Sequence, residues 1–256
     1  MPDNRRVTHP RFFVPAATTE GDTVDLPPDE ADHLARVLRL RAGAPVRVFD
    51  GHGREFDAMV DRVGKSRASV RVGPPQPAQA EPRVAVTLAH AVLKGDKMDA
   101  VVRDAVMMGA AVIQPLLTTR TEASVAALRR SNRRERWERI AVASAKQCGR
   151  ATVPAIREPQ TFVDALALRA STAPADVGLM LVEPSATKDV LTLAGLPAPA
   201  PERATVFVGP EGGWTPDEIE VAARTCRLVT LGARTLRADA IALIALSALF
   251  AHWGEF

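Results

Sequence analysis

Two glycine-containing turns near the end of the chain place charged side chains beside main chain that a ligand could reach. The first turn is Gly209-Pro210-Glu211-Gly212-Gly213, and the second begins at Gly232 and leads to Asp239. Glycine has no side chain to keep a ligand away from the main chain, and the unbonded N–H groups at a helix start face the same space. We therefore interpret the two turns as parts of one ligand pocket. Its charged residues are Glu211, Arg234, Arg237 and Asp239.

Similar elements surround both turns. Residues 204–208 form an apolar run of strand length, and Thr215 with Glu218 three residues later predicts a capped helix with Pro216 at its first position. Residues 227–231 predict a second strand, and Asp239 precedes a predicted helix that runs to about Trp253. Ligands of open α/β sheets bind at the carboxyl ends of strands, which favours a cofactor site.

The alternative is that the two turns only connect strands to helices, as short turns often do. Neither turn has the GxxxxGK[ST] or GxGxxG pattern. This disfavours enzymes that bind nucleoside triphosphates or dinucleotides.

The rest of the chain predicts an α/β protein with two parts. Residues 45–50, 55–63 and 68–72 are expected strands of a small β-barrel, with a helix over residues 29–40 between earlier strands. Four prolines within residues 73–82 predict a stiff linker. Beyond it, predicted strands alternate with helical patterns, which indicates a parallel sheet covered on both faces. These strands are residues 84–93, 110–117, 177–183, 204–208 and 227–231.

The composition excludes several other classes. The chain has 256 residues, 46% of them hydrophobic and 25% charged, so a buried core is expected. Its longest apolar stretch, residues 240–251, is too short to span a bilayer, and no apolar signal region follows the first residues, so we expect a cytoplasmic protein. Cys148 and Cys226 lie far apart and the five histidines are scattered, so neither a disulfide nor a metal site is expected.

A basic segment is the strongest feature of the charge distribution. The net charge is only +3, but six arginines occur between positions 129 and 139, in a segment predicted to be helical through Lys146. These arginines could meet phosphates, or they could form a solvated face with internal Arg–Glu pairs. With 8 Phe, 3 Trp and no Tyr, a sheet that stacks RNA bases on aromatic side chains is disfavoured. Any RNA would be recognised mainly by its phosphates and its shape.

Five motifs, in their order along the chain, carry a resemblance to a known family. They are RFFVP (residues 11–15), HLARVLRLRAGAPVRVFDGHGREFDAMV (33–60), RWERIAVASAKQCGRATVP (136–154), GPEGGWTPDEIE (209–220) and LGARTLRAD (231–239). Together they resemble the ribosomal small-subunit RNA uridine-N3 methyltransferases of the SPOUT superfamily. The resemblance implies S-adenosylmethionine as methyl donor, a homodimer, and a uridine of 16S ribosomal RNA as acceptor. It also implies a PUA-like RNA-binding barrel at residues 1–73, a linker at 74–82 and a SPOUT domain with a trefoil knot at 83–256.

The resemblance further implies which residues bind each partner. The donor would be held largely by the main chain of three loops, and the residues expected there are Leu181, Val182, Glu183, Gly209, Pro210, Glu211, Gly212, Gly213, Leu231, Gly232 and Leu236. The residues expected to bind RNA are Arg11, His33, Arg36, Arg39, Lys94, Gln147 and Arg150.

Methylation of uridine N3 adds a chemical requirement, because N3 carries a proton that must leave before its lone pair can attack. Arg237 is the candidate cation that would stabilise the resulting anion, and Glu211 or Asp239 would orient the base or accept the proton. The alternative for Arg237 is that it only pairs with Asp239 and fixes the loop.

The chain departs from the family pattern at several positions. Asp104 and Met107 stand where the family usually has lysine and glutamate, and Ala238-Asp239-Ala240 replaces threonine-glutamate-threonine. Substrate choice could therefore differ while the donor loops are retained. Two other hypotheses stay open at this point: a SPOUT enzyme acting on another RNA position, such as a ribose 2′-hydroxyl, and a non-catalytic RNA-binding assembly factor.

Overall fold

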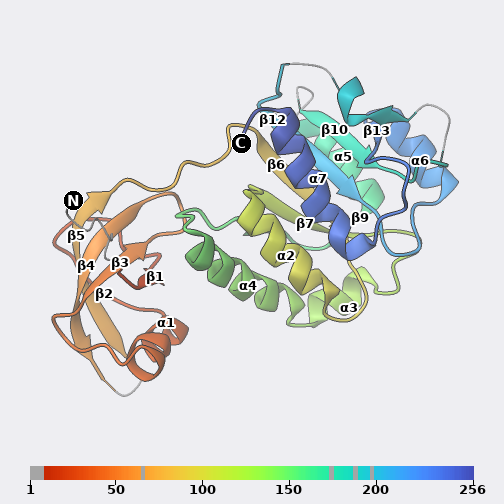
Figure 1. The fold of residues 1–256 in the computed structure, drawn as a ribbon. Coiled ribbons are helices and arrows are strands. Elements are labelled where there is room, and N and C mark those ends of the chain that lie inside the picture. Colours follow the sequence, from red (N-terminus) through yellow and green to blue (C-terminus); the bar gives the residue numbers. More distant parts are fainter. Residues whose placement is uncertain (1–8, 65–66, 173–175, 187–189, 197–198) are drawn as a thin grey trace. The chain divides into compact units, whose positions relative to one another are not determined.

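The computed structural model describes residues 9–64, 67–172, 176–186, 190–196 and 199–256. The chain divides into two compact units (Figure 1). The N-terminal unit comprises Met1–Glu81 with Ala145–Val153, and the C-terminal unit comprises Pro82–Ser144 with Pro154–Phe256. A segment that follows the predicted linker by more than sixty positions therefore packs with the N-terminal unit, which the sequence pattern did not indicate.

The N-terminal unit is a curled five-stranded sheet in the order β1-β3-β4-β5-β2. Its strands are β1 (Arg11–Phe13), β2 (Thr23–Asp25), β3 (Pro45–Phe49), β4 (Glu55–Val63) and β5 (Ala68–Gln76). All neighbours are antiparallel except β1 and β3. The core contains the fully buried Phe12, Leu34, Val48 and Val70, because alternate residues of each strand face inward.

Strand β5 extends into the predicted linker. Pro75 lies opposite Phe56 and Gln76 opposite Glu55, so the ladder continues past the expected end at Val72. The register of β2 with β5 ends at Arg71, which leaves this part of β5 at an edge of the sheet. Proline is tolerated at such an edge because its missing N–H costs no ladder hydrogen bond.

The predicted helix over residues 29–40 is only partly α-helical. Helix α1 (Pro28–Asp32) continues as a π-helical turn, η1 (His33–Val37), in which the Leu38 N–H donates to the His33 carbonyl oxygen at 3.0 Å. Arg39 then adopts a φ of 52°, which is uncommon for a residue with a side chain. The wider turn ends the helix early, and Arg36, Val37, Leu38 and Arg39 are exposed.

The C-terminal unit is built on an eight-stranded parallel sheet, as the alternating pattern predicts. The strand order is β11-β13-β10-β12-β6-β7-β8, with β9 also paired to β7. The strands are β6 (Ala85–Ala91), β7 (Val112–Leu117), β8 (Ala155–Ile156), β9 (Gln160–Thr161), β10 (Val177–Leu181), β11 (Leu191–Thr192), β12 (Arg203–Val208) and β13 (Arg227–Thr230). Neighbouring strands far apart in sequence require helical crossovers.

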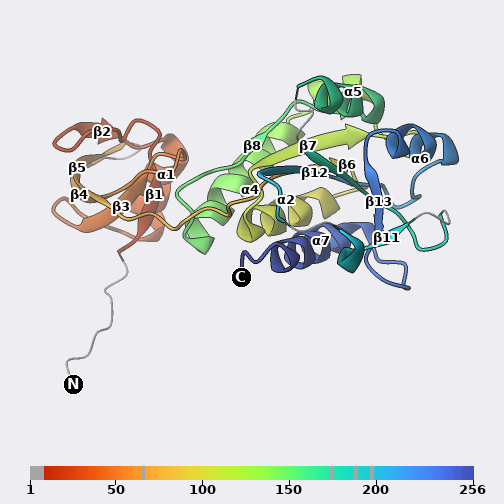
Figure 2. The same cartoon turned by 90° about the horizontal axis from the view of Figure 1, so that it is seen from above.

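Helices cover both faces of this sheet (Figure 2). Figure 2 shows α2 and α7 on one side and α5 and α6 on the other. The α-helices of this unit are α2 (Lys97–Met108), α3 (Val125–Arg130), α4 (Arg133–Cys148), α5 (Phe162–Thr172), α6 (Pro216–Ala223) and α7 (Ala238–His252), with a short 3-10 turn, η2 (Leu193–Gly195). The α/β class is thus confirmed. The trefoil knot stays a prediction of the resemblance.

The arginine-rich segment is two helices instead of one. Ser131 has extended backbone and ends α3, and its hydroxyl accepts a hydrogen bond from the Arg133 N–H at the start of α4. A serine at this position competes with the helical hydrogen bonds, which explains the break. Among the described residues, no helix is long and apolar enough to span a membrane.

Candidate functional site

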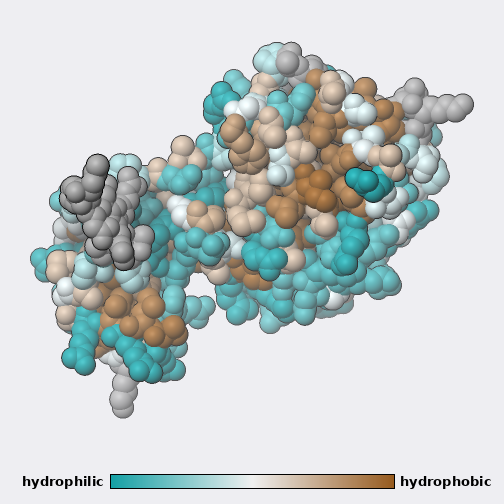
Figure 3. All heavy atoms as spheres, viewed as in Figure 1, coloured by the Kyte–Doolittle hydropathy of each residue, from teal (hydrophilic) through white to brown (hydrophobic). Residues whose placement is uncertain are grey.

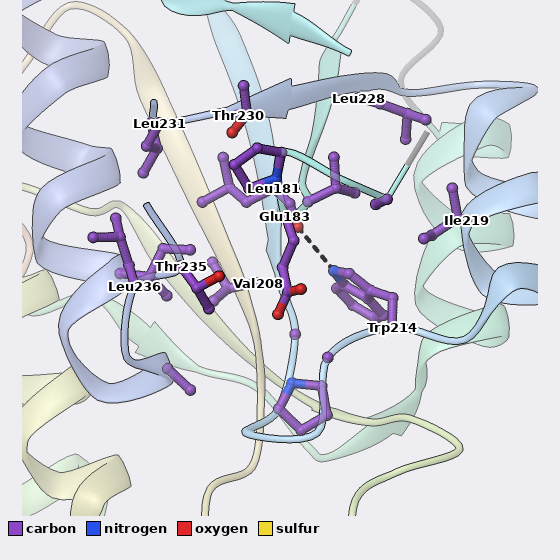
Figure 4. A pocket seen from close by; sticks show the side chains of 18 of the residues that line it. Leu181, Glu183, Val208, Trp214, Ile219, Leu228, Thr230, Leu231, Thr235 and Leu236 are labelled. Atoms are coloured by element: carbon purple, nitrogen blue, oxygen red, sulfur yellow. Dashed lines mark hydrogen bonds between the residues drawn. The ribbon is translucent and has the colours of Figure 1, made fainter. Parts of the chain in front are cut away.

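A pocket of about 940 Å³ lies at the carboxyl ends of three adjacent strands of the C-terminal unit (Figure 4). Strand β10 pairs with β12 on one side and with β13 on the other, all parallel, so the loops that follow them meet at one edge. This arrangement brings together the two glycine turns and the loop after β10, the three loops in which the donor-binding residues are expected.

Most residues expected to hold a cofactor line this pocket. Those that line it are Leu181, Val182, Glu183, Gly209, Pro210, Glu211, Gly212, Gly213, Leu231 and Leu236. Gly232 is not part of the lining. Its φ of 111° instead allows the chain to turn directly after β13.

Trp214 is a site residue that the sequence analysis did not identify. Its indole Nε1 donates to the Leu181 carbonyl oxygen at 2.9 Å, and its ring packs on Phe162 at a centroid distance of 4.9 Å. A Cβ at Gly209 would lie only 3.0 Å from the same nitrogen. Gly209 is therefore required for the close approach of the indole, which joins the loop after β10 to the loop after β12.

The predicted capping box at the start of α6 is present. The Thr215 hydroxyl accepts from the Glu218 N–H at 3.3 Å, and the Glu218 carboxylate accepts from the Thr215 N–H at 2.9 Å. Glu218 is buried and also accepts from the Thr119 N–H at 2.8 Å. One carboxylate thus fixes both the helix start and the loop after β7.

Arg120 enters the pocket from that loop after β7. Its guanidinium donates to the Gly212 carbonyl oxygen, and its side chain lies along Gly212, where a Cβ would be 3.3 Å from Arg120 Cδ. Arg120 lies 92 positions from Gly212, and no motif drew attention to it.

The candidate base Glu211 is held by two lysines. Its carboxylate accepts from Lys97 Nζ at 2.9 Å and from the Lys94 N–H at 3.3 Å. Burial opposes ionisation of this carboxyl, but the hydrogen bonds from Lys97 and Lys94 outweigh it and lower the pKa of Glu211. A carboxylate with a lowered pKa is a weak base near neutral pH, which favours an orienting role for Glu211.

Arg237 and Asp239 form an ion pair at the start of α7. Arg237 Nε donates to Asp239 Oδ1 at 3.0 Å and Nη2 donates to Oδ2 at 2.6 Å. The hydrogen bonds from Arg237 lower the pKa of Asp239. Arg237 is the residue before the helix, so α7 starts two residues earlier than the predicted start after Asp239.

Neither member of this pair lines the pocket, but the neighbouring Leu236 and Ala238 do. The pair therefore sits beside the pocket. The Arg237 side chain is 79% exposed, so it is accessible to a substrate.

The expected RNA-binding residues divide into two groups. Arg11 donates two hydrogen bonds to the Glu55 carboxylate, at 3.0 and 2.9 Å. It also donates to the carbonyl oxygens of Ala145, Lys146 and Arg150, so it caps the C-terminal end of α4. Arg150 is buried and pairs with Glu81. These two arginines therefore have structural roles that the resemblance did not indicate.

The other expected RNA-binding residues are more accessible. Arg36, Arg39 and Gln147 are exposed, and His33 is half-buried with its Nδ1 3.3 Å from Lys146 Nζ. Lys94 pairs with Glu122 at 2.5 Å in the C-terminal unit.

The arginine-rich segment forms internal ion pairs at two of its positions. Arg134 contacts Glu138 and Glu158, and Arg136 contacts Asp96 and Asp99. For these two residues the structure favours the internal-pair alternative over phosphate binding. In the parts of the chain that are described, no group of three or more His, Cys, Asp or Glu side chains could hold a metal ion.

Comparison with known proteins defines the class of this fold and site. The model of an RNA methyltransferase domain matches residues 80–250, and the model of an RNA methyltransferase PUA domain matches residues 26–73. The ribosomal RNA small subunit methyltransferase E of Synechocystis sp. is 33% identical over 226 residues, which cover 88% of this chain and 72% of that protein. The protein of the same name from Rickettsia conorii is 29% identical over 93% of both chains.

A solved structure agrees over nearly the whole chain. The ribosomal RNA small subunit methyltransferase E of Neisseria gonorrhoeae, bound to S-adenosyl methionine, has a TM-score of 0.85 and 30% identity, covering 96% of this chain and 98% of that one. This chain belongs to the ribosomal RNA small subunit methyltransferase E family.

Proposed function

We propose that this protein transfers a methyl group from S-adenosylmethionine to N3 of a uridine in 16S ribosomal RNA. The single observation that supports this most is the pocket formed by the loops after β10, β12 and β13, in a chain similar along its length to a methyltransferase structure bound to that cofactor. The substrate follows from the names of the relatives and from the motif resemblance.

The residues of the pocket fit this cofactor. A cavity of about 940 Å³ is within the usual size range for a small-molecule site, and its glycines leave main chain accessible on two sides. Apolar side chains such as Leu231, Leu236 and Val208 suit the flat adenine ring. When bound, S-adenosylmethionine supplies an electrophilic methyl group on a sulfonium.

The residues beside the pocket meet the remaining chemical requirement. Loss of the N3 proton leaves negative charge on the uracil ring and its oxygens, and a guanidinium can donate two hydrogen bonds to such a group. Arg237 is accessible and held by Asp239, so we assign it this stabilising role. Asp239 positions Arg237, and Glu211 orients the glycine turn through Lys97. The N3 proton passes to solvent water, which reaches this exposed position.

The N-terminal unit is proposed to bind the RNA. Arg36, Arg39 and Gln147 are exposed in this unit, and cations contact phosphates without reading sequence. Arg11 would support this surface by holding the end of α4, and Arg150 by its ion pair with Glu81, instead of contacting RNA themselves.

We also propose a homodimer that works in the cytoplasm, where ribosomal subunits are found. Figure 3 shows hydrophobic side chains gathered on the face of the C-terminal unit that includes α7. Ile244 of this helix is 38% exposed, and α7 has apolar residues on several sides. An exposed apolar patch of this kind often marks a protein interface. Light scattering at micromolar concentration should give twice the chain mass, and a monomer would contradict the dimer.

The substrate is tested by mapping modified nucleosides. Ribosomal RNA from a strain that lacks the gene should lack N3-methyluridine at one position, and the purified protein with S-adenosylmethionine should restore it. Restoration should require 16S RNA or the small subunit. A methyl group on a ribose 2′-hydroxyl would contradict the N3 assignment, and no methyl transfer to any RNA would contradict the enzyme.

A further inference from the structure

Two opposite charges in the pocket have no role in the chemistry assigned above. Figure 4 shows the Glu183 side chain extending into the pocket between Val208 and Trp214. Arg120 lines the same pocket from the loop after β7. A Cβ placed on Gly213 would be 3.8 Å from Glu183 Oε1 and 3.9 Å from Arg120 Nη1. Both charged groups therefore lie next to Gly213.

Neither charge is neutralised by the protein within the described residues. Arg120 makes one hydrogen bond there, to the Gly212 carbonyl oxygen, and has no carboxylate partner. The Glu183 carboxylate has neither a hydrogen bond nor an ion pair in the same part of the chain. Glu211 and Arg237 differ, because Glu211 pairs with Lys97 and Arg237 pairs with Asp239. Arg234 also lines the pocket, but it is not among the groups within 4 Å of the Gly213 Cβ position.

Gly213 brings its main chain close to both charges. Its φ of 69° is unfavourable for a residue with a side chain, and any Cβ there would lie in contact with both charged groups. An unpaired carboxylate and an unpaired guanidinium beside the same glycine suit a ligand group that carries one positive and one negative charge.

The chemistry of the ligand identifies that group. The amino-acid end of S-adenosylmethionine carries an α-ammonium and an α-carboxylate on one carbon atom. We propose that Glu183 and Arg120 bind this end, with the ammonium donating to the Glu183 carboxylate and Arg120 donating to the α-carboxylate. This inference rests on the proposed function. It adds charged side chains to a site that the resemblance describes as largely main chain.

The arrangement of the lining supports this orientation. In Figure 4, Leu231 and Leu236 lie on one side of Glu183, and Trp214 and Ile219 lie on the other side. Apolar residues suit the adenine ring, whereas a zwitterion requires charged partners. Charge-assisted hydrogen bonds contribute more than neutral ones, so losing one should weaken binding roughly 10- to 100-fold.

The test compares two ligands that differ only at the amino-acid end. S-adenosylhomocysteine has the ammonium and the carboxylate, whereas 5′-methylthioadenosine has neither. Isothermal titration calorimetry would measure both ligands on the wild type, Arg120→Met and Glu183→Gln. We expect each variant to bind S-adenosylhomocysteine at least 10-fold more weakly and 5′-methylthioadenosine within twofold of the wild type. Retained binding of the second ligand also shows that the variant is folded.

Matched controls come from the start of β12, outside the pocket. Arg203 and Glu202 are exposed and do not line the pocket, so Arg203→Met and Glu202→Gln should bind both ligands as the wild type does. If the control variants weaken S-adenosylhomocysteine binding as much as Arg120→Met and Glu183→Gln do, the general charge of the protein explains the effect and the subsite is wrong.

A third ligand distinguishes the contact with the ammonium group from the contact with the α-carboxylate. Decarboxylated S-adenosylmethionine keeps the ammonium and lacks the carboxylate, so Arg120→Met should bind it as well as the wild type, and Glu183→Gln should bind it at least 10-fold more weakly. Equal weakening of all three ligands by both variants would overturn the subsite while leaving the proposed function intact. Failure of the wild type to bind any of the three would overturn both.

Discussion

The indole nitrogen of Trp214 donates a 2.9 Å hydrogen bond to the carbonyl oxygen of Leu181. Leu181 is the last residue of β10 and Trp214 lies in the loop after β12; both line the pocket, and Trp214 is 8% exposed. This bond satisfies a carbonyl at the end of β10 and at the same time fixes the ring beside Gly209. The shape of the pocket therefore depends on one side chain that joins two loops.

Trp214→Phe should lower stability and cofactor affinity modestly. Phenylalanine keeps most of the packing against Phe162 but leaves the Leu181 carbonyl without its donor, a loss of about 0.5–1.5 kcal/mol. Trp214→Ala should cost about 3–5 kcal/mol, because it also leaves a cavity. Urea unfolding followed by circular dichroism measures both. Equal stability of the Phe and Ala variants would show that the ring does not contribute to the core.

Gly209→Ala should weaken S-adenosylmethionine binding about tenfold without unfolding the protein. The added methyl would lie 3.0 Å from Trp214 Nε1, so the indole must move away from Leu181. Gly195→Ala is the control, because the added methyl there meets only ordinary contacts of 3.6 Å or more. Calorimetry on both variants tests the prediction, and unchanged affinity for Gly209→Ala would contradict the tight approach of the indole.

Arg237→Ala should reduce single-turnover methylation about 100-fold, by analogy with the loss of one electrostatic stabiliser of a transition state. Cofactor affinity should change less than twofold, because Arg237 lies outside the pocket lining. Arg224→Ala removes an exposed arginine that also pairs with a carboxylate, and it should retain full activity. A methylation rate for Arg237→Ala within threefold of the wild type would restrict Arg237 to fixing the loop.

Arg11→Ala should destabilise the protein by about 3–5 kcal/mol. The substitution leaves the Glu55 carboxylate, which is 5% exposed, without the bidentate partner that holds it, and exposes carbonyl groups at the end of α4. Arg47 also contacts Glu55, at 3.6 Å, but its side chain is 39% exposed, so Arg47→Ala should cost less than about 1 kcal/mol. Thermal unfolding compares the two. Similar melting temperatures would favour the RNA-binding role that the resemblance implies for Arg11.

His90 should make stability depend on pH below neutrality. Burial lowers its pKa, and hydrogen bonds to the carbonyls of Ala91 and Ala238 only partly offset this. Because the folded pKa lies below the unfolded value of about 6.5, the unfolded state takes up the proton more readily as the pH falls through that value. The contribution of His90 is therefore complete above about pH 6.5 and declines below it, by at most about 1.4 kcal/mol per pH unit.

Urea unfolding between pH 5 and 7.5 measures this dependence. His90→Gln should flatten the profile, whereas His252→Gln, which changes an exposed residue, should leave the slope unchanged. The prediction is wrong if His90→Gln and the wild type lose stability in parallel.

The sequence by itself determined local secondary structure and the adjacency of the two glycine turns. Apolar runs identified five of the eight strands of the parallel sheet, β6, β7, β10, β12 and β13, but not the two-residue strands β8, β9 and β11. Thr215, Pro216 and Glu218 identified the start of α6, because capping depends on neighbouring residues. The adjacency of the glycine turns followed from parallel pairing.

The tertiary structure alone decided which distant residues meet. Trp214 binds Leu181 across 33 positions and Arg120 binds Gly212 across 92, so no local pattern could indicate either contact. The same holds for Arg11, whose carboxylate partner is 44 positions away and which proved to hold α4. A side chain's charge is visible in the sequence, but whether it is buried, paired or available to a ligand depends on groups that only the folded chain brings together.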